Sequence, residues 1–124
     1  MKLLDYYYSI RNHTTTGGNT QFDVTLLSEC SVYDGHFPGM PVAPGVCNIQ
    51  MIKECVEQMT GQSLLLESIA QCKFLAMITP QQHDDLQINI DLLNDDDKKY
   101  NIKASICRDG KEFITLKCVM VYTP

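Results

Sequence analysis

One stretch of this sequence has the period of a helix, while most other apolar residues alternate as they do in strands. From Gly45 to Thr60 the apolar residues recur every three or four positions. Pro44 precedes this stretch and Gly61 follows it, and these residue types are favoured at the start and just past the end of a helix. We therefore predict a single helix, Gly45–Thr60. Its apolar positions cover more than half of the circumference, so other elements must surround it.

The segments on both sides of this helix have the pattern of strands. Alternation is clear from Ile102 to Ile106, and one apolar face per strand predicts an antiparallel sheet covered on one side. The glycines of TTTGGNT predict a hairpin between the first two strands, and Asp109-Gly110 predicts a two-residue turn between the last two. Residues 1–124 are thus expected to form one α+β domain, with the sheet curled around the helix. The expected strands are Leu3–His13, Thr20–Leu27, Leu64–Ile78, Leu86–Leu93, Tyr100–Cys107 and Phe113–Tyr122.

Composition argues against several classes of function. The formal charge is -5 and the ten Lys and Arg residues are scattered, so we expect no nucleic-acid partner. No apolar stretch approaches the roughly 20 residues that span a bilayer, so we expect no membrane partner. The six cysteines show no CxxC spacing and the chain start lacks signal-peptide features, which predicts reduced thiols in the core of a cytoplasmic protein. The acidic run at 95–97, followed by two lysines, is typical of a solvated turn; we expect neither a metal nor a cofactor.

The loop before the helix carries a more specific signal. It reads GHFPGMPVAPGV at 35–46, and KFLAMITP follows at 73–80. These stretches resemble the FabZ and FabA type of 3-hydroxyacyl-[acyl-carrier-protein] dehydratases. The resemblance implies a hotdog fold and a homodimer with active sites at the seam between subunits. It also implies dehydration of 3-hydroxyacyl thioesters, carried by acyl carrier protein, to trans-2-enoyl thioesters in fatty-acid or polyene-type synthesis.

The resemblance assigns roles to the residues of this motif. His36 matches the catalytic base, and an imidazole with an ordinary pKa of about 6.5 suits proton abstraction beside a thioester. Gly45 matches the glycine whose backbone N–H meets the thioester oxygen at the helix start. The prolines of the loop would hold these two groups at a fixed spacing. Phe37, Pro44 and Val46 complete the expected substrate-binding set.

Gln50 departs from the family pattern. It stands fourteen residues after His36, where the family carries Glu or Asp, and a neutral amide cannot donate a proton as an acid. In one explanation the chain dehydrates slowly, with His36 as both base and acid while Gln50 orients the hydroxyl or a water. In a second, the chain completes a composite site in a heterodimer with a homologue that keeps the Glu. In a third, it is a hotdog acyl thioesterase in which the two residues hold a water.

Three further predictions concern polar residues near the helix. Glu54 shares the polar arc of the helix with Gln50, which predicts a solvated face. Glu54 lies one turn, about 5.4 Å, beyond Gln50 and would have to bridge that distance to replace the missing acid. Asn48 projects into the apolar arc, where a buried amide needs partners, so it either lines the acyl tunnel or caps a neighbouring strand. The tyrosines at positions 6–8 are expected to pack in an edge strand.

Overall fold

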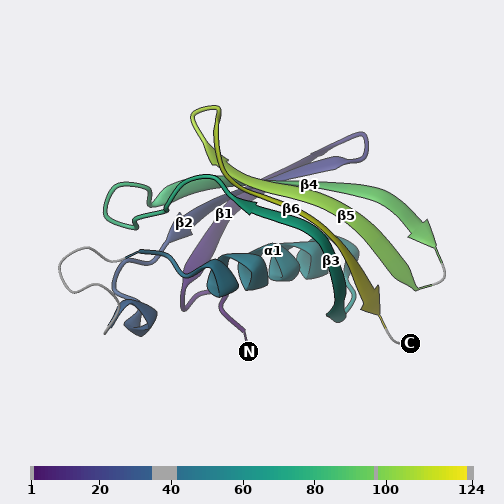
Figure 1. The fold of residues 1–124 in the computed structure, drawn as a ribbon, viewed down its shortest axis with the longest axis horizontal. Coiled ribbons are helices and arrows are strands. Elements are labelled where there is room, and N and C mark those ends of the chain that lie inside the picture. The colour runs from purple at the N-terminus through teal and green to yellow at the C-terminus, as the bar shows by residue number, and fades with distance from the viewer. Residues whose placement is uncertain (1, 35–41, 97, 123–124) are drawn as a thin grey trace.

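A curved antiparallel sheet of six strands covers one helix (Figure 1). The computed structural model describes residues 2–34, 42–96 and 98–122, without the side chains of residues 95 and 96. The elements are β1 (Tyr8–Thr16), β2 (Asn19–Leu26), a 3-10 turn (Ser31–Tyr33), α1 (Gly45–Thr60), β3 (Leu64–Phe74), β4 (Asp85–Asp96), β5 (Lys99–Arg108) and β6 (Lys111–Tyr122). This arrangement confirms the predicted α+β architecture.

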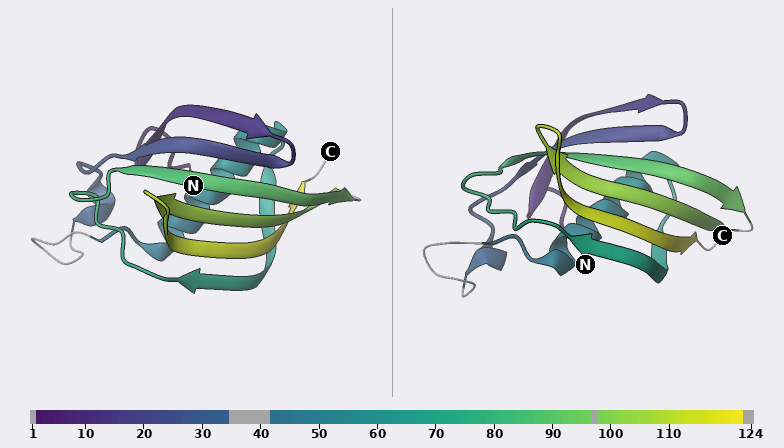
Figure 2. Two further views of the ribbon diagram at one scale, coloured as in Figure 1. Left: turned by 90° about the horizontal axis from the view of Figure 1, so that it is seen from above. Right: turned by 45° about the horizontal axis from the view of Figure 1, so that its top comes forward.

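The order of the strands places the helix in the middle of the molecule. The sheet runs β1-β2-β4-β5-β6-β3, and every neighbouring pair is antiparallel. The chain leaves β2 near one edge, passes through α1, and enters the sheet again as β3 at the opposite edge (Figure 2). The helix therefore lies across the concave face, and β1 and β3 are the two edge strands.

The core lies between α1 and the concave face of the sheet. On the helix, Met51, Ile52, Cys55 and Val56 are fully buried. The strands present alternate residues to them, as in β4, where Ile88 and Ile90 are buried and the intervening residue is partly exposed. Full burial of an aliphatic side chain contributes about 1.5–3 kcal/mol, so this layer supplies much of the free energy that offsets chain entropy.

The ends of the helix and the last turn follow the sequence prediction. Pro44 precedes α1 in an extended conformation, and Gly61 ends the helix at φ 71, with its N–H bonded to the Glu57 carbonyl. Asp109 and Gly110 both have positive φ, 50 and 79, as the two central residues of a type I′ hairpin turn require. Glycine adopts a positive φ without the strain that a Cβ would cause, which explains why glycine stands at positions 61 and 110.

The structure corrects two strand boundaries and the placement of the tyrosines. The first strand begins at Tyr8, because residues 3–7 form a turn in which the Tyr7 N–H donates to the Leu3 carbonyl at 2.8 Å. β3 ends at Phe74 rather than at residue 78. Tyr8 is the first residue of the edge strand β1, whereas Tyr7 lies in the preceding turn, and both rings are fully buried in the core. The predicted acidic turn includes residue 97, which lies outside the described residues.

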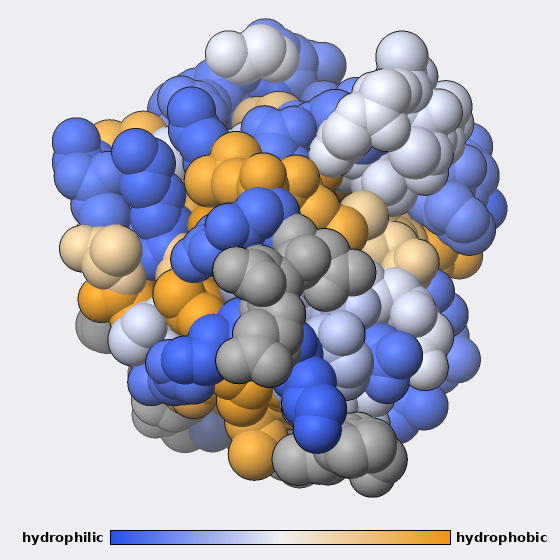
Figure 3. All heavy atoms as spheres, turned by 90° about the vertical axis from the view of Figure 1, so that its right-hand side faces the viewer, coloured by the Kyte–Doolittle hydropathy of each residue, from blue (hydrophilic) through white to orange (hydrophobic). Residues whose placement is uncertain are grey.

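The surface and the thiols add three observations. Hydrophobic side chains gather in the middle of the face near the C-terminal end and are bordered by hydrophilic ones (Figure 3).

Four of the six cysteines are buried, namely Cys30, Cys47, Cys55 and Cys118, and all six are free thiols. Within the ranges that the structure describes, no helix has the length and apolar character to cross a membrane.

Candidate functional site

A cavity of about 310 Å³ lies where α1 begins and where the chain leaves β3. Its wall comes from the segment before the helix, the first turn of α1, the residues around the end of β3, and one residue of β6. The lining residues are Val42, Ala43, Gly45, Asn48, residues 74–78 and Ile114. Asn48 is the only polar side chain among these described lining residues, so the cavity is suited to an apolar chain with one polar group.

Backbone hydrogen bonds hold this wall in place. The Ala43 N–H donates to the Ile78 carbonyl at 2.7 Å, which joins the segment before the helix to the segment after β3. On the other side, the Leu75 N–H donates to the Phe113 carbonyl at 2.8 Å. The cavity is therefore bounded by main chain that is tied to the sheet.

Glycine at position 45 lies against the ring of Phe74. A Cβ built on Gly45 would lie 2.7 Å from Cε1 of Phe74, closer than side-chain carbons approach one another. Glycine thus lets the start of the helix come close to the aromatic ring that lines the same cavity. The Gly45 backbone can then face a bound molecule directly.

The start of α1 carries backbone donors without acceptors. The first three N–H groups of the helix, at residues 45–47, find no hydrogen-bond acceptor among the described residues, and Pro44 supplies no side-chain cap. The first turn also contains no acidic residue. Such a helix end has a positive potential and unsatisfied donors, and it can bind an anion or stabilise a developing oxyanion.

Exposed apolar side chains surround the mouth of the cavity. Val46 is 70% exposed, and Phe74, Leu75 and Met77 are 58%, 54% and 66% exposed. Exposed apolar side chains beside a cavity are a common feature of ligand-binding and protein-binding sites. The sequence KFLAMITP contains three of these residues, and its apolar content is the signal that identifies them.

Asn48 is held by a tyrosine from the start of the chain. The Tyr7 hydroxyl donates to Asn48 Oδ1 at 2.6 Å, and the Tyr7 ring packs 6.0 Å from that of Tyr33. Asn48 is 2% exposed. Of the two placements predicted for this amide, lining a cavity is the one observed, and its oxygen is satisfied from the side opposite to solvent.

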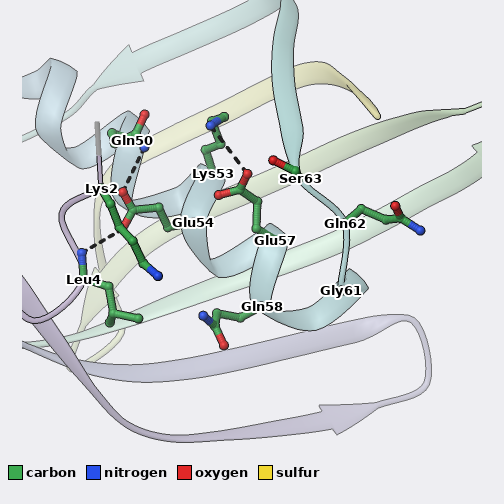
Figure 4. Close-up of a pocket in the computed structure, with 10 residues that line it drawn as sticks. All are labelled: Lys2, Leu4, Gln50, Lys53, Glu54, Glu57, Gln58, Gly61, Gln62 and Ser63. Atoms are coloured by element: carbon green, nitrogen blue, oxygen red, sulfur yellow. Dashed lines mark hydrogen bonds and ion pairs between the residues drawn. The ribbon is translucent and has the colours of Figure 1, made fainter. Parts of the chain in front are cut away.

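Gln50 lies in a different hollow of the same helix, shown in Figure 4. This open groove of about 610 Å³ is lined by α1, the start of the chain and the residues just after the helix. Gln50 Nε2 donates to Glu54 Oε2 at 2.8 Å, and Lys53 Nζ lies 3.6 Å from Glu57 Oε2. The groove is therefore polar, in contrast to the cavity at the helix start.

Glu54 is buried rather than solvated, which corrects the expectation for this residue. It is 4% exposed and accepts four hydrogen bonds, from the N–H groups of Leu3 and Leu4, the Tyr8 hydroxyl and Gln50 Nε2. Three of the four donors belong to Leu3, Leu4 and Tyr8, about fifty positions away, so no local pattern could have revealed them. Its oxygens are fully engaged in tying the chain start to α1, and they are not directed at a substrate.

The structure brings some of the predicted site residues together and separates others. Gly45 lines the cavity, Pro44 precedes the helix, and the exposed Val46 follows Gly45 on α1 without lining the cavity. Gln50 follows Asn48 by two positions, which places it about 200° away around the helix. His36 and Phe37 lie outside the described residues.

Similarity to known proteins agrees with this geometry. The family model of the ApeI-like proteins, described as ApeI dehydratase, matches residues 12–114. A curated relative, the 3-hydroxyacyl-[acyl-carrier-protein] dehydratase FabZ of Wolbachia pipientis wMel, is 31% identical over 93 residues. This match covers 69% of the chain and 65% of the relative, so the chain spans less than two thirds of that relative's length.

Solved structures share the fold at low sequence identity. The dehydratase heterocomplex ApeI:P from Xenorhabdus doucetiae has a TM-score of 0.72 at 16% identity, with 90% of this chain and 96% of that chain covered. A putative thioesterase, yhdA from Lactococcus lactis, has a TM-score of 0.69 at 10% identity, with coverage of 100% and 98%. The predicted hotdog fold is thereby confirmed. With more than half of its residues matched by the family model, this chain belongs to the ApeI-like dehydratase family.

Proposed function

We propose that this chain dehydrates 3-hydroxyacyl thioesters, delivered by acyl carrier protein, to trans-2-enoyl thioesters in fatty-acid or polyene-type synthesis. Family membership and the HFPG-containing motif at 35–46 support this activity. The observation that carries the proposal is the uncapped start of α1, which opens into an apolar cavity at Gly45. An acyl chain would occupy the cavity while its thioester oxygen lies against the helix end.

In this proposal each step uses a group of the motif. His36 removes a proton from the carbon next to the thioester, and the electron pair moves toward the thioester oxygen. The Gly45 N–H stabilises the charge that develops there, a contribution of about 2.7–4 kcal/mol for a donor of this kind in other enzymes. The C3–O bond then breaks, and the departing hydroxide takes a proton to leave as water. Gln50 cannot supply that proton, so it must come from His36 or from a partner subunit.

A second subunit would complete the site by pairing along β3. This strand is an edge, hydrogen-bonded only to β6 among the described strands, and it exposes Leu65 and Ile69 at 64% and 44%. An edge that is both unpaired and apolar favours pairing with another chain. Gln50 faces away from the cavity of its own chain. It would therefore contact the active-site cavity of the other subunit, across the seam between the two chains.

Gln50 supports a second candidate, in which the partner is a homologue rather than a second copy. A homologue with Glu at this position would supply the acid to the site that contains His36 of this chain. The reciprocal site, with Gln50, would lack the acid. The likeness to one chain of a dehydratase heterocomplex agrees with this arrangement. In either case we place the reaction in the cytoplasm, where the six thiols would remain reduced.

The two candidates are separated by following enoyl formation from a 3-hydroxyacyl substrate on acyl carrier protein. The purified chain is assayed alone and after mixing with a homologue that carries the Glu, with a His36→Ala variant as the matched control in both assays. Turnover alone supports the homodimer, and turnover only in the mixture that depends on His36 supports the composite site. No turnover in either assay contradicts both, and thioester cleavage without dehydration identifies a thioesterase.

A further inference from the structure

Among the described residues that line the cavity at the start of α1, Asn48 has the one polar side chain, and only its oxygen has a hydrogen-bond partner there. Asn48 Oδ1 accepts from the Tyr7 hydroxyl, but no described residue accepts from Asn48 Nδ2. Buried amides are normally hydrogen-bonded at both ends, since an unpaired buried donor costs about 1–3 kcal/mol. A donor left open in a ligand cavity is therefore available to the ligand.

The orientation of this amide is set by Tyr7. The distance of 2.6 Å between the hydroxyl and Asn48 is that of an O–H···O bond, shorter than the usual 2.9 Å of an N–H···O bond. Burial raises the pKa of Tyr7 above its ordinary value, and the neighbouring Tyr33 raises it further. The phenol therefore keeps its proton. A protonated phenol donates to the amide oxygen and turns Nδ2 away from itself. Tyr7 is fully buried, so this arrangement is held by the core.

Asn48 lies deeper in the cavity than the helix end. Gly45 is partly exposed at the cavity mouth, whereas Asn48 is 2% exposed. The two residues are three positions apart, so they share a face of α1 and are separated by about 4.5 Å along its axis. A 3-hydroxyacyl thioester whose carbonyl oxygen meets the Gly45 N–H would carry its 3-hydroxyl two carbons further in.

We propose that Asn48 binds the 3-hydroxyl oxygen of the substrate through its Nδ2 donor, with Tyr7 as the residue that orients it. This assignment rests on the proposed function and adds to it a determinant of specificity. The other side chains that line the cavity are apolar and would leave a hydroxyl without a partner. Acyl chains that carry a 3-hydroxyl are thus favoured over chains that lack it.

Binding measurements with unreactive analogues test this assignment apart from catalysis. The probes are pantetheine amides of a (3R)-3-hydroxyacyl chain and of the same chain without the hydroxyl, in which nitrogen replaces the thioester sulfur. Isothermal titration calorimetry gives the dissociation constant of each with the full chain. We expect the hydroxylated probe to bind roughly three- to tenfold more tightly, the range of one net hydrogen bond.

The matched variants are Tyr7→Phe with Asn48→Leu, and Tyr7→Phe alone. The double variant removes both polar groups, keeps the shapes close, and is expected to bind the two probes equally. The single variant keeps Nδ2 but loses its orientation, so it should retain part of the preference. Should the double variant fail to fold, the side-chain ¹H–¹⁵N resonances of Asn48 in the unaltered protein should shift with the hydroxylated probe only.

Each remaining outcome contradicts a distinct statement. Equal binding of the two probes by the unaltered protein, or a preference that survives in the double variant, would overturn the role of Asn48 and leave the proposed function standing. Failure of the unaltered protein to bind either probe would overturn the proposed function, and the role of Asn48 with it.

Discussion

Glu54 and Asn48 lie on the same helix and are almost equally hidden from solvent, at 4% and 2% exposure, but their hydrogen bonding differs. The Glu54 carboxylate accepts four hydrogen bonds, two of them from backbone N–H groups at the start of the chain. Asn48 has a partner for its oxygen, while its Nδ2, at a cavity, finds no acceptor in the part of the chain that the structure describes. The first residue thus holds the fold together, whereas the second is prepared for a molecule that is not part of the chain.

The largest effect is expected on the dehydration rate, when an acid is introduced at position 50 beside the Glu54 carboxylate. Gln50→Glu should raise the dehydration rate by about 10²–10⁴-fold, the range for a general acid–base group. Gln50 Nε2 lies 2.8 Å from Glu54 Oε2, so a carboxyl introduced at position 50 would lie beside the Glu54 carboxylate. A neighbouring carboxylate raises the pKa of the introduced carboxyl and favours its protonated form. Enoyl formation gives the rate.

The control for this change is Gln50→Leu, which removes the amide without adding an acid and should give no gain. If Gln50→Glu also gives no gain, the missing acid is not what limits the reaction, and the cavity or the 35–41 loop must differ from those of active relatives.

Removal of Glu54 should cause the largest loss of stability. Glu54→Ala leaves several buried donors without an acceptor, and we expect the free energy of unfolding to fall by about 3–4 kcal/mol. Glu54→Gln keeps part of the acceptor capacity and should lose about half as much. Urea-induced unfolding followed by circular dichroism measures both. A loss below about 1 kcal/mol for the alanine variant would show that the carboxylate does not hold the chain start.

Two adjacent tyrosines provide a matched pair for the same comparison. Tyr8→Phe removes one of several donors to Glu54 and should lower the free energy of unfolding by about 0.5–1 kcal/mol. Tyr7→Phe deprives the Asn48 oxygen of its hydrogen bond and should lower it by about 1–2 kcal/mol. Both variants keep a fully buried ring. Both losses are measured by urea unfolding under one set of conditions. Equal losses would contradict the view that Glu54 keeps other donors when one is removed, whereas the Asn48 oxygen does not.

The smallest effect on stability is expected at the start of the helix. Gly45→Ala places a Cβ 2.7 Å from the Phe74 ring, but this ring is 58% exposed and can move, so the free energy of unfolding should change by less than about 1 kcal/mol. The displaced ring narrows the cavity, and the affinity for the acyl-pantetheine amides should fall about three- to tenfold. Adding Phe74→Ala should recover that affinity. Failure to recover it would place the ligand outside this cavity.

Local patterns in the sequence were sufficient to predict the framework of this fold. The helix Gly45–Thr60 was predicted with its observed limits, because its period, the preceding proline and the following glycine all act within a few residues. The Asp109-Gly110 turn was predicted for the same reason. The 35–46 motif led to the family, which the match to residues 12–114 confirms.

Features that depend on distant segments could not be read in this way. Glu54 was assigned to a solvated face, because its partners Leu3 and Leu4 are brought to it only by the complete fold. Tyr7 was assigned to an edge strand, whereas it lies in the turn just before β1 and its ring is buried in the core. The pairing of Asn48 with Tyr7 spans forty-one positions and has no local signature. The roles predicted for His36, Phe37 and Gln50 remain predictions.

The buried phenols also give the molecule an optical property. The chain has no tryptophan, so its near-ultraviolet absorbance comes mainly from six tyrosines. Burial raises the pKa of Tyr7 and of Tyr8 in the folded state, while in the unfolded chain both would ionise near the ordinary value of about 10. The unfolded state therefore loses these protons first, so the contribution of these two groups to stability is fully present below about pH 10 and is lost as the pH rises above it. In an alkaline titration, part of the rise in near-ultraviolet absorbance that marks tyrosinate formation should appear only when the protein unfolds, so the tyrosines report on the integrity of the core without any added label.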